Sequence, residues 1–297
     1  MEKRLFARRL RENTQAWLLL LPTFVFLAMF TFYPLIKTVY TSFFMKKLAV
    51  RVPQYVGWGN YQKLWEDEKF WKVLGNTIVF VIGTVPAAMA VAMAMALFVN
   101  RAIRGGGFMR TFYFYPTVIP AVAIANIWLF IYTPKYGILN SILEWFHIPS
   151  VNWLGSVDTV LGATIVMAVW KEAGFLMVFY LAGLQNIPKD LYEAAEVDGG
   201  RPWFVFWKIT FPLLMPSTLF IFIIATTGTF KLVDHLPVMT GGGPDNASNL
   251  LLFHIYETAF KFWDEGMAAT LTVVLIVLLL IVSCVQFFGL DKKIHYS

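Results

Sequence analysis

Residues 193–199 read Glu-Ala-Ala-Glu-Val-Asp-Gly, and Ile-Thr-Phe-Pro follows at residues 209–212. The first stretch is typical of a short acidic, alanine-rich helix that ends in a glycine turn, and it lies between two long apolar segments. Such a polar segment has to stay outside lipid, and its small residues suit close docking against another protein. We therefore interpret residues 185–208 as a coupling loop, through which a membrane subunit is driven by a motor that it does not contain. The candidate coupling residues are Glu193, Ala194, Ala195, Asp198 and Gly199.

The composition is that of a membrane protein. Of the 297 residues, 58% are hydrophobic and only 14% are charged, whereas a soluble globular chain carries about 25% charged residues. A helix that crosses a membrane needs about 20 mainly apolar residues. Six segments meet this requirement, and they lie at about 16–44, 73–99, 111–133, 159–184, 209–233 and 266–289. We expect an all-α membrane protein, a six-transmembrane-helix bundle that forms a single domain over residues 1–297.

The distribution of Lys and Arg predicts how the bundle is oriented. The N-terminal tail carries five of these residues, and the loops at 101–110 and 185–208 carry three each. Because cytoplasmic loops are enriched in them, we place both termini and the 185–208 loop in the cytoplasm. The segments at 45–72, 135–157 and 233–265 then lie outside. This topology explains the net charge of +6 better than nucleic-acid binding, which we do not expect.

The sequence contains no recognisable motif for catalysis or for a cofactor. It has no G-x-x-x-x-G-K-[ST] phosphate loop, and we interpret the Gly-Gly-Gly-Pro cluster at 241–244 as a tight turn. The four histidines are far apart and are not at metal-ligand spacing. The single cysteine, Cys284, allows no intrachain disulfide. We expect no enzyme activity, no metal and no cofactor in this chain.

Two charged residues, Lys171 and Glu172, stand inside the fourth apolar segment. A charge at the centre of a membrane helix costs about 2.5–3.5 kcal/mol on insertion scales. Neighbours on a helix point about 100° apart, so we expect that the two do not pair along one face and that at least one faces a watery cavity. With aromatic residues such as Phe175 beside it, that cavity suits a hydroxyl-rich or charged solute. The alternative is a buried ion pair with a neighbouring helix, for instance with Asp234 or Lys231.

Hydroxyl side chains follow in the fifth apolar segment. Thr226, Thr227 and Thr229 lie close together there. Threonine hydroxyls in a helix can bond back to their own carbonyls or to a neighbouring helix, which is one explanation for them. The other explanation is that Thr229 lines the same cavity as Lys171.

In the coupling loop and the segment after it, the chain resembles the inner-membrane permease subunits of binding-protein-dependent ABC importers. The hallmark of that family is Glu-Ala-Ala, three residues, Gly, nine residues and then Ile-x-Leu-Pro. Here the motif is Glu193-Ala194-Ala195, Gly199 and Ile209-Thr210-Phe211-Pro212, and its one departure is Phe211 in place of leucine. The resemblance runs nearly end to end. It is to the carbohydrate branch, and most of all to the first permease of maltose-type and glycerol-phosphate-type systems.

The resemblance implies partners, a location and a mechanism. A second permease subunit pairs with the chain in a bacterial or archaeal cytoplasmic membrane, and an extracytoplasmic binding protein delivers the solute. Two ATP-binding subunits dock beneath, bind ATP and Mg²⁺, and swing the coupling helices when they close. The family's solute contacts correspond here to residues of the fourth and fifth segments, namely Lys171, Glu172, Phe175, Ala225, Gly228, Thr229 and Leu232.

Two alternatives stay open on the sequence alone. An ion-coupled secondary transporter that acts as a single chain would use an intramembrane carboxylate, and Glu172 is the one good candidate. The second open question is the identity of the solute. Binding of a phosphate group would require more positive charge than one lysine beside a glutamate provides, so we favour a neutral sugar or oligosaccharide. The size of the chain, by contrast, favours glycerol phosphate.

Overall fold

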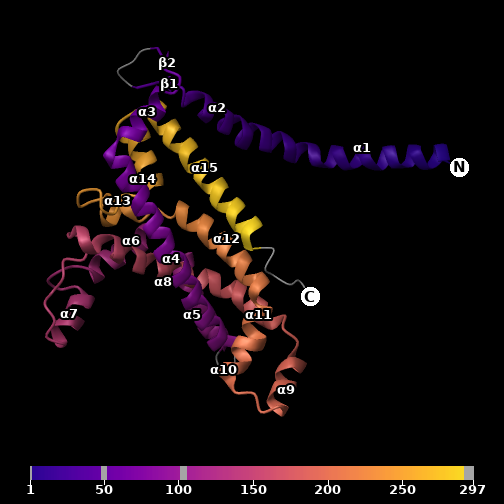
Figure 1. The fold of residues 1–297 in the computed structure, drawn as a ribbon, viewed down its shortest axis with the longest axis vertical. Helices are drawn as coiled ribbons and strands as arrows, with labels where there is room; N and C mark the ends of the chain where they lie inside the picture. The colour runs from indigo at the N-terminus through magenta and orange to yellow at the C-terminus, as the bar shows by residue number, and fades with distance from the viewer. Residues whose placement is uncertain (1, 48–51, 101–105, 291–297) are drawn as a thin grey trace. The chain divides into compact units, whose positions relative to one another are not determined.

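A computed structural model describes residues 2–47, 52–100 and 106–290 of the chain (Figure 1). The chain forms two compact units, one made of Met1–Glu66 with Ile255–Val274 and the other of Asp67–His254 with Leu275–Ser297. The single domain over residues 1–297 stays a prediction. The predicted cytoplasmic position of the termini also stays a prediction, because Met1 and residues 291–297 lie outside the described residues, as do the arginines of the 101–105 stretch.

The first unit begins with a long apolar helix. It consists of α1 (Glu2–Leu27), the π-turn η1 (Ala28–Phe32) and α2 (Tyr33–Thr41). Pro34 lies in the first turn of α2, where its missing N–H is tolerated. Thr14–Thr41 is long and apolar enough to cross a membrane, and no residue of its most apolar window is buried within the described chain. Its apolar side chains are therefore available to lipid or to another chain.

Short elements complete this unit. They are β1 (Phe44–Met45), β2 (Gln54–Tyr55), α3 (Gly59–Glu66), the π-turn η3 (Glu257–Lys261) and the first part of α15 (Glu265–Leu290). The two strands are antiparallel, with Phe44 opposite Tyr55 and Met45 opposite Gln54.

Polar contacts join the two sequence segments of the first unit. The Nδ2 atom of Asn60 donates to the carbonyl of Ser42 at 2.8 Å, and the hydroxyl of Thr270 donates to the same carbonyl at 3.2 Å. Lys47 and Asp264 form an ion pair at 2.7 Å. The start of α15 is thereby fixed to the turn that follows α2.

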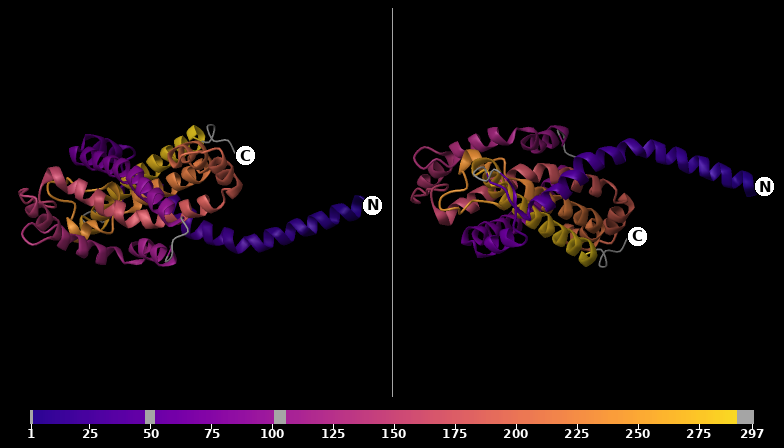
Figure 2. Two further views of the ribbon diagram at one scale, coloured as in Figure 1. Left: turned by 90° about the horizontal axis from the view of Figure 1, so that it is seen from below. Right: turned by 90° about the horizontal axis from the view of Figure 1, so that it is seen from above.

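The second unit is a helical bundle. Its elements are α4 (Glu68–Asn100), α5 (Gly106–Val118), α6 (Ala121–Ile131), α7 (Ile138–Trp145), α8 (Val157–Gln185), α9 (Lys189–Val197), α10 (Pro202–Val205), the π-turn η2 (Phe206–Thr210), α11 (Phe211–Leu213), α12 (Met215–Lys231), α13 (Leu236–Met239), α14 (Leu251–Tyr256) and the last part of α15. Helices α4 and α8 pack along each other, α5 packs against α8, and α12 contacts both α4 and α8 (Figure 2).

Small residues allow this close packing. Ala88, Ala92 and Ala96, one turn apart on α4, are almost completely buried, as expected for helices that approach closely in lipid. Gly174 allows α8 to approach α5 closely, because a Cβ at that position would collide with the backbone carbonyl of Tyr113 on α5. The alanine-rich face of α4 is therefore buried in the bundle, whereas other side chains of the helix, such as Ile82, are exposed.

A tight turn fastens the segment after α12 to the start of α4. Gly241 and Gly242 have positive φ angles of 58° and 84°, which confirms the turn predicted from the glycine cluster. Lys72 of α4 forms an ion pair with Asp245 at 2.6 Å. Asn76, one turn further along α4, donates from Nδ2 to the backbone of the same turn at 2.7 Å.

The described chain has four helices long and apolar enough to cross a membrane, or up to six if each of two bent pairs is one span. The bent pairs correspond to the spans predicted at 111–133 and 209–233. Helices α5 and α6 meet at 98°, with Pro120 as the N-cap of α6, since a proline disfavours helix in the residue before it. The second pair, α10–α11 with α12, bends by 66° between Pro212 and Pro216.

Candidate coupling loop and translocation site

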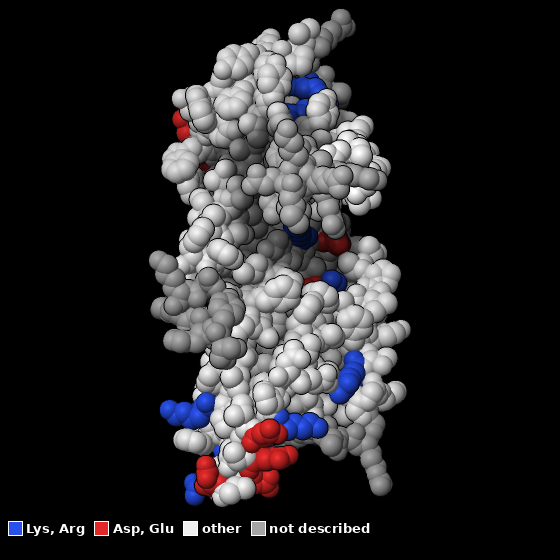
Figure 3. Space-filling view, turned by 90° about the vertical axis from the view of Figure 1, so that its right-hand side faces the viewer, with Lys and Arg blue, Asp and Glu red and all other residues white. Residues whose placement is uncertain are grey.

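The predicted coupling loop contains a short exposed helix, α9. Pro188 is its N-cap, and Asp190 lies in its first turn, where a negative charge suits the helix dipole. Glu193 and Ala194 are exposed on α9, and Ala195 is half-buried. Acidic and basic side chains gather at this end of the second unit (Figure 3). The candidate coupling residues of the helix are therefore accessible on the described chain.

Helix α9 ends in a turn that needs glycine. Asp198 is the C-cap, and its N–H donates to the carbonyl of Ala194 at 3.0 Å. Gly199 has a φ of 71°, a conformation that glycine adopts without steric cost. The N–H of Gly200 donates to the carbonyl of Ala195 at 2.8 Å. Asp198 and Gly199 thus terminate the helix and turn the chain back toward the bundle.

A side-chain contact links α9 to the segment that leads into α12. The hydroxyl of Tyr192 lies 3.2 Å from Oγ1 of Thr210, which is buried at the end of η2. The chain continues from there through α11 into α12. Helix α9 is therefore connected to the start of α12 by a side-chain contact as well as by the chain itself.

Aromatic side chains fill the return segment after α9. The ring of Trp207 contacts those of Trp203, Phe206 and Phe211, with centroids 5.6, 5.0 and 5.1 Å away. Trp203 and Trp207 are exposed on the described chain. Because tryptophan prefers the boundary between water and lipid, this cluster suits a position at the membrane surface.

Lys171 and Glu172 form an ion pair with each other on α8. The Nζ and Oε1 atoms are 3.2 Å apart, and the side chains are 17% and 23% exposed. The expectation that these neighbours do not pair was therefore wrong, because the long lysine side chain can reach back to the glutamate. A pair with Asp234 or Lys231 on another element is not the arrangement found. The two opposite charges leave little net charge at this point of α8.

The other predicted solute residues lie on two contacting helices. Phe175 is half-buried on α8, and its ring meets Phe179 edge-on with centroids 5.1 Å apart. Gly228 of α12 is exposed, and a Cβ at that position would meet no atom within 4 Å. Thr229 and Leu232, at the end of α12, are buried. Gly228 thus borders open space while its neighbour Thr229 is enclosed.

The threonines before Gly228 hold α12 together. The hydroxyls of Thr226 and Thr227 donate to carbonyls one turn earlier at 2.7 and 3.0 Å, which confirms the first of the two explanations for these two residues. Thr226 also accepts a hydrogen bond of 2.8 Å from Nε2 of Gln286 on α15. Ala225 beside them is buried.

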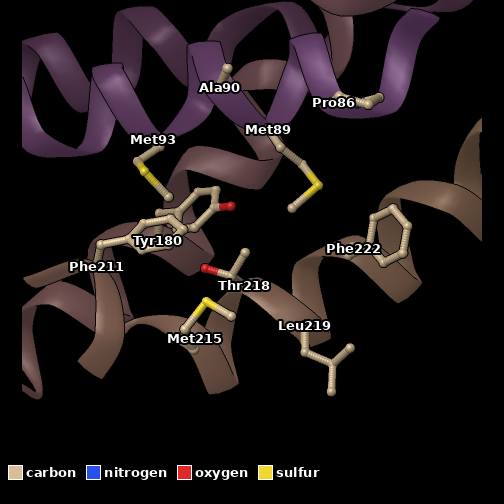
Figure 4. Close-up of a pocket in the computed structure, with 10 residues that line it drawn as sticks. All are labelled: Pro86, Met89, Ala90, Met93, Tyr180, Phe211, Met215, Thr218, Leu219 and Phe222. Atoms are coloured by element: carbon tan, nitrogen blue, oxygen red, sulfur yellow. The ribbon is translucent and has the colours of Figure 1, made fainter. Parts of the chain in front are cut away.

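Two cavities of the second unit lie away from the predicted solute residues. One of about 630 Å³ lies among α4, α12 and α15. The other, of about 490 Å³, is shown in Figure 4, where Met89, Met93 and Met215 converge on it. Its full lining is Pro86, Met89, Ala90, Met93, Tyr180, Phe211, Met215, Thr218, Leu219 and Phe222. None of the seven predicted solute residues lines either cavity, so their role stays a prediction.

His235 is a buried polar residue that the sequence analysis did not single out. It is 2% exposed, and neither ring nitrogen has a hydrogen-bond partner among the described residues. It follows α12, outside the predicted span. Burial, and next the positive charge of the nearby Lys171, lower the pKa of His235 to about 3. The only sign of it in the sequence is a single histidine in the short segment that follows the fifth apolar segment.

The described residues contain no group of three or more His, Cys, Asp or Glu side chains that could hold a metal ion. The acidic residues of the coupling loop, Asp190, Glu193, Glu196 and Asp198, are instead spread over an exposed helix and its turn. That spread suits contact with a basic surface of another protein.

Comparison with known proteins agrees with this geometry. The model of the family described as binding-protein-dependent transport system inner membrane component matches residues 87–294. The permease SmoG of a sulfoquinovosyl glycerol transport system from Agrobacterium fabrum is 32% identical, over 93% of this chain and 90% of that protein. The permease UgpA of an sn-glycerol-3-phosphate transport system from the same organism is 33% identical, over 95% and 96%. The permease LacF of a lactose transport system from Rhizobium radiobacter is 31% identical, over 95% of each chain.

A solved structure shares the fold. The crystal structure of a bacterial ABC transporter involved in the import of the acidic polysaccharide alginate contains a chain that matches this one with a TM-score of 0.82. The match covers 97% of this chain and 99% of that chain, at 21% sequence identity.

Proposed function

Because this chain belongs to the family of binding-protein-dependent transport system inner membrane components, which are permease subunits and not enzymes, we propose that it carries a sugar or related solute through the cytoplasmic membrane. The importer is driven by ATP hydrolysis in separate subunits. The observation that carries the coupling role is the exposed helix α9, which ends at Gly199 with a φ of 71° and contacts the base of α12 through Tyr192 and Thr210.

We infer that Glu193, Ala194, Ala195, Asp198 and Gly199 contact an ATP-binding subunit. The small side chains of Ala194 and Ala195 allow the helix to fit closely into a groove, and Glu193 is free to pair with a basic group beside it. Two ATP-binding subunits, a second permease subunit and an extracytoplasmic binding protein complete the importer. Both termini and α9 then lie in the cytoplasm, as the distribution of Lys and Arg favours.

The solute is proposed to meet Lys171, Glu172 and Phe175 of α8 and Gly228, Thr229 and Leu232 at the end of α12. Gly228 supports this because the space in front of it is open. Phe175 supports it because an aromatic face packs well on the apolar face of a sugar ring. We expect one state of the transport cycle to open this region into a cavity.

A neutral sugar or oligosaccharide is the solute that these residues favour. Lys171 is already paired with Glu172, so no uncompensated cation is left among the six residues to offset the desolvation of an anion. The relatives do not discriminate between the two solute classes, because permeases of sn-glycerol-3-phosphate and of lactose transport systems match at nearly equal identity. The charge balance on α8 therefore supports the neutral solute.

The alternative of an ion-coupled secondary transporter has no support. Its one candidate carboxylate, Glu172, is paired with Lys171, and the relatives belong to binding-protein-dependent systems. The exposed helix α9 would also have no role in a transporter that acts as a single chain.

Transport by the reconstituted complex tests the proposed function. The chain is purified with the second permease and the ATP-binding subunits of its own system, placed in liposomes, and supplied with the cognate binding protein. We expect ATP-dependent uptake of at least one of maltose, lactose or trehalose. Uptake of sn-glycerol-3-phosphate alone would contradict the neutral solute. Sugar uptake by this chain without any ATP-binding subunit would contradict the coupling role.

A further inference from the structure

His235 is the buried polar side chain for which the proposed function so far has no use. Its ring stacks on that of Phe80 from α4, with centroids 6.1 Å apart and planes at 20°. The ring is 2% exposed. Within the described chain, both Nδ1 and Nε2 are buried without a hydrogen-bond partner. A neutral imidazole has one N–H donor and one acceptor nitrogen, so both functions are unused in this arrangement.

The His235 ring packs against an apolar cluster through Phe80, and the positive charge of Lys171 lies near enough to act on it. Phe80 belongs to a buried cluster with Ala168, Leu232, Leu236, Leu250 and Phe253. In such a cluster a leucine would fill the space without burying unpaired polar atoms, which is unfavourable. A histidine at this position therefore reduces the stability of this arrangement, and its two nitrogens are available to partners in another state of the protein.

The position of this cluster identifies what those partners are. Ala168 lies one helical turn before Lys171 and Glu172 on α8, and Leu232 is itself one of the predicted solute residues. His235 follows Leu232 by three residues. Its ring is therefore adjacent to the region in which the solute is proposed to pass.

We propose that His235 is a further solute-contacting residue, whose two ring nitrogens hydrogen-bond hydroxyl groups of the sugar. This inference rests on the proposed function and adds to it a residue outside the predicted set. A hydroxyl group both donates and accepts, so two adjacent sugar hydroxyls can satisfy the donor and the acceptor of the imidazole together. In the arrangement described here the ring is covered by Phe80. It becomes accessible when the segment that follows α12 separates from α4 during transport.

Substitutions of His235 in the reconstituted complex test this role. His235→Leu removes both nitrogens, and His235→Gln keeps one donor and one acceptor. Leu236→Met is the matched control, because it alters packing in the same cluster without changing any polar group. The measurements are KM for uptake of maltose, lactose or trehalose, whichever the wild type transports, together with basal ATPase activity and the thermal stability of the complex.

We expect His235→Leu to raise the KM for the sugar about tenfold, which corresponds to the loss of a hydrogen bond to the solute. Its complex should be at least as heat-stable as the wild type, and the control Leu236→Met should keep the wild-type KM and basal ATPase activity. His235→Gln should stay within about threefold of the wild-type KM. This combination of higher stability with weaker transport separates solute contact from a structural role.

Other outcomes overturn the inference. A wild-type KM in His235→Leu would show that the nitrogens do not meet the solute. An equal rise of KM in Leu236→Met would assign the effect to packing. If His235→Leu does not assemble, His235→Met replaces it as the apolar variant, and failure of both would make the residue structural. If the wild-type complex transports no sugar, the proposed function itself fails, which is a different result from sugar transport that is insensitive to His235.

Discussion

The hydroxyl of Tyr192 on α9 lies 3.2 Å from the hydroxyl of Thr210 at the end of η2. Thr210 is buried, whereas most of α9 is exposed. Two hydroxyls at this distance form a hydrogen bond, so we expect a displacement of α9 to move the segment that leads into α11 and α12. If α9 binds an ATP-binding subunit as proposed, this contact offers a route from it to the helix on which Gly228 and Thr229 lie.

Tyr192→Phe should weaken the coupling of ATP hydrolysis to transport. The substitution removes the hydroxyl but keeps the ring, so the chain should assemble normally. Loss of a hydrogen bond worth about 1 kcal/mol changes an equilibrium several-fold. We therefore expect the number of sugar molecules taken up per ATP to fall several-fold. Tyr136→Phe, at an exposed tyrosine before α7, is the control. An unchanged ratio in Tyr192→Phe would mean that the contact transmits nothing.

Glu193→Lys should detach the ATP-binding subunits. Glu193 is exposed on α9, and reversal of its charge would place like charges together at the docking site. Such a contact costs enough to weaken binding about tenfold or more. Co-purification of the ATP-binding subunits measures it, with Glu144→Lys on the exposed face of α7 as the control. Full transport by Glu193→Lys would contradict the coupling role of α9.

Gly199→Ala should impair coupling although there is room for a methyl group. A Cβ at Gly199 would meet no atom within 4 Å, so any effect comes from the φ of 71°. That conformation costs a residue with a Cβ about 1–2 kcal/mol. Gly199→Asn should impair coupling less than Gly199→Ala, because asparagine tolerates a positive φ better than alanine does.

Gly162→Ala is the matched control for Gly199. A Cβ at Gly162 would also meet no atom within 4 Å, but this residue lies inside α8 with a helical backbone. We expect normal ATPase activity and transport from Gly162→Ala. If Gly199→Ala behaves in the same way, the turn does not require glycine.

The double substitution Lys171→Met with Glu172→Gln should assemble better than either single substitution. A single substitution leaves one charge without its partner, which costs about 3–5 kcal/mol for a fully buried pair and less here, since both side chains are partly exposed. The double variant should keep its assembly and change its KM or its preference among sugars. Gel filtration in mild detergent measures assembly. Disassembly of the double variant would make the pair structural.

The features that the sequence predicted well are local ones. Helix α9 and its glycine turn depend on residues close together in the chain, as do the back-bonded hydroxyls of Thr226 and Thr227. The buried alanine face of α4 has an equally local cause, because small residues one turn apart favour close helix contacts. These features need no knowledge of the rest of the fold.

The features that were missed depend on side-chain conformation or on distant packing. The pair between Lys171 and Glu172 depends on the rotamer of a long side chain, which helical periodicity does not give. The 98° bend before α6 is consistent with Pro120, but its size is set by the helices around it. His235 is buried because Phe80, far away in the sequence, stacks on it.

His235 should make the complex less stable in acid. Burial and the charge of Lys171 lower its pKa to about 3, from about 6.5 in the unfolded chain. Between these two values the unfolded chain binds one more proton than the folded chain, so stability falls as the pH falls below about 6.5. The loss from this residue amounts to about 1 kcal/mol between pH 7.5 and 5.5.

Thermal unfolding of the complex at pH 7.5 and at pH 5.5 measures this effect. The other titratable groups, including the nearby Lys171, are the same in the wild type and in His235→Leu, so their contributions cancel in the comparison. We expect the difference in Tm between the two pH values to be smaller in His235→Leu. Leu236→Met, which keeps the histidine, should show the wild-type difference. Equal differences in His235→Leu and the wild type would mean that His235 is not held neutral by its surroundings.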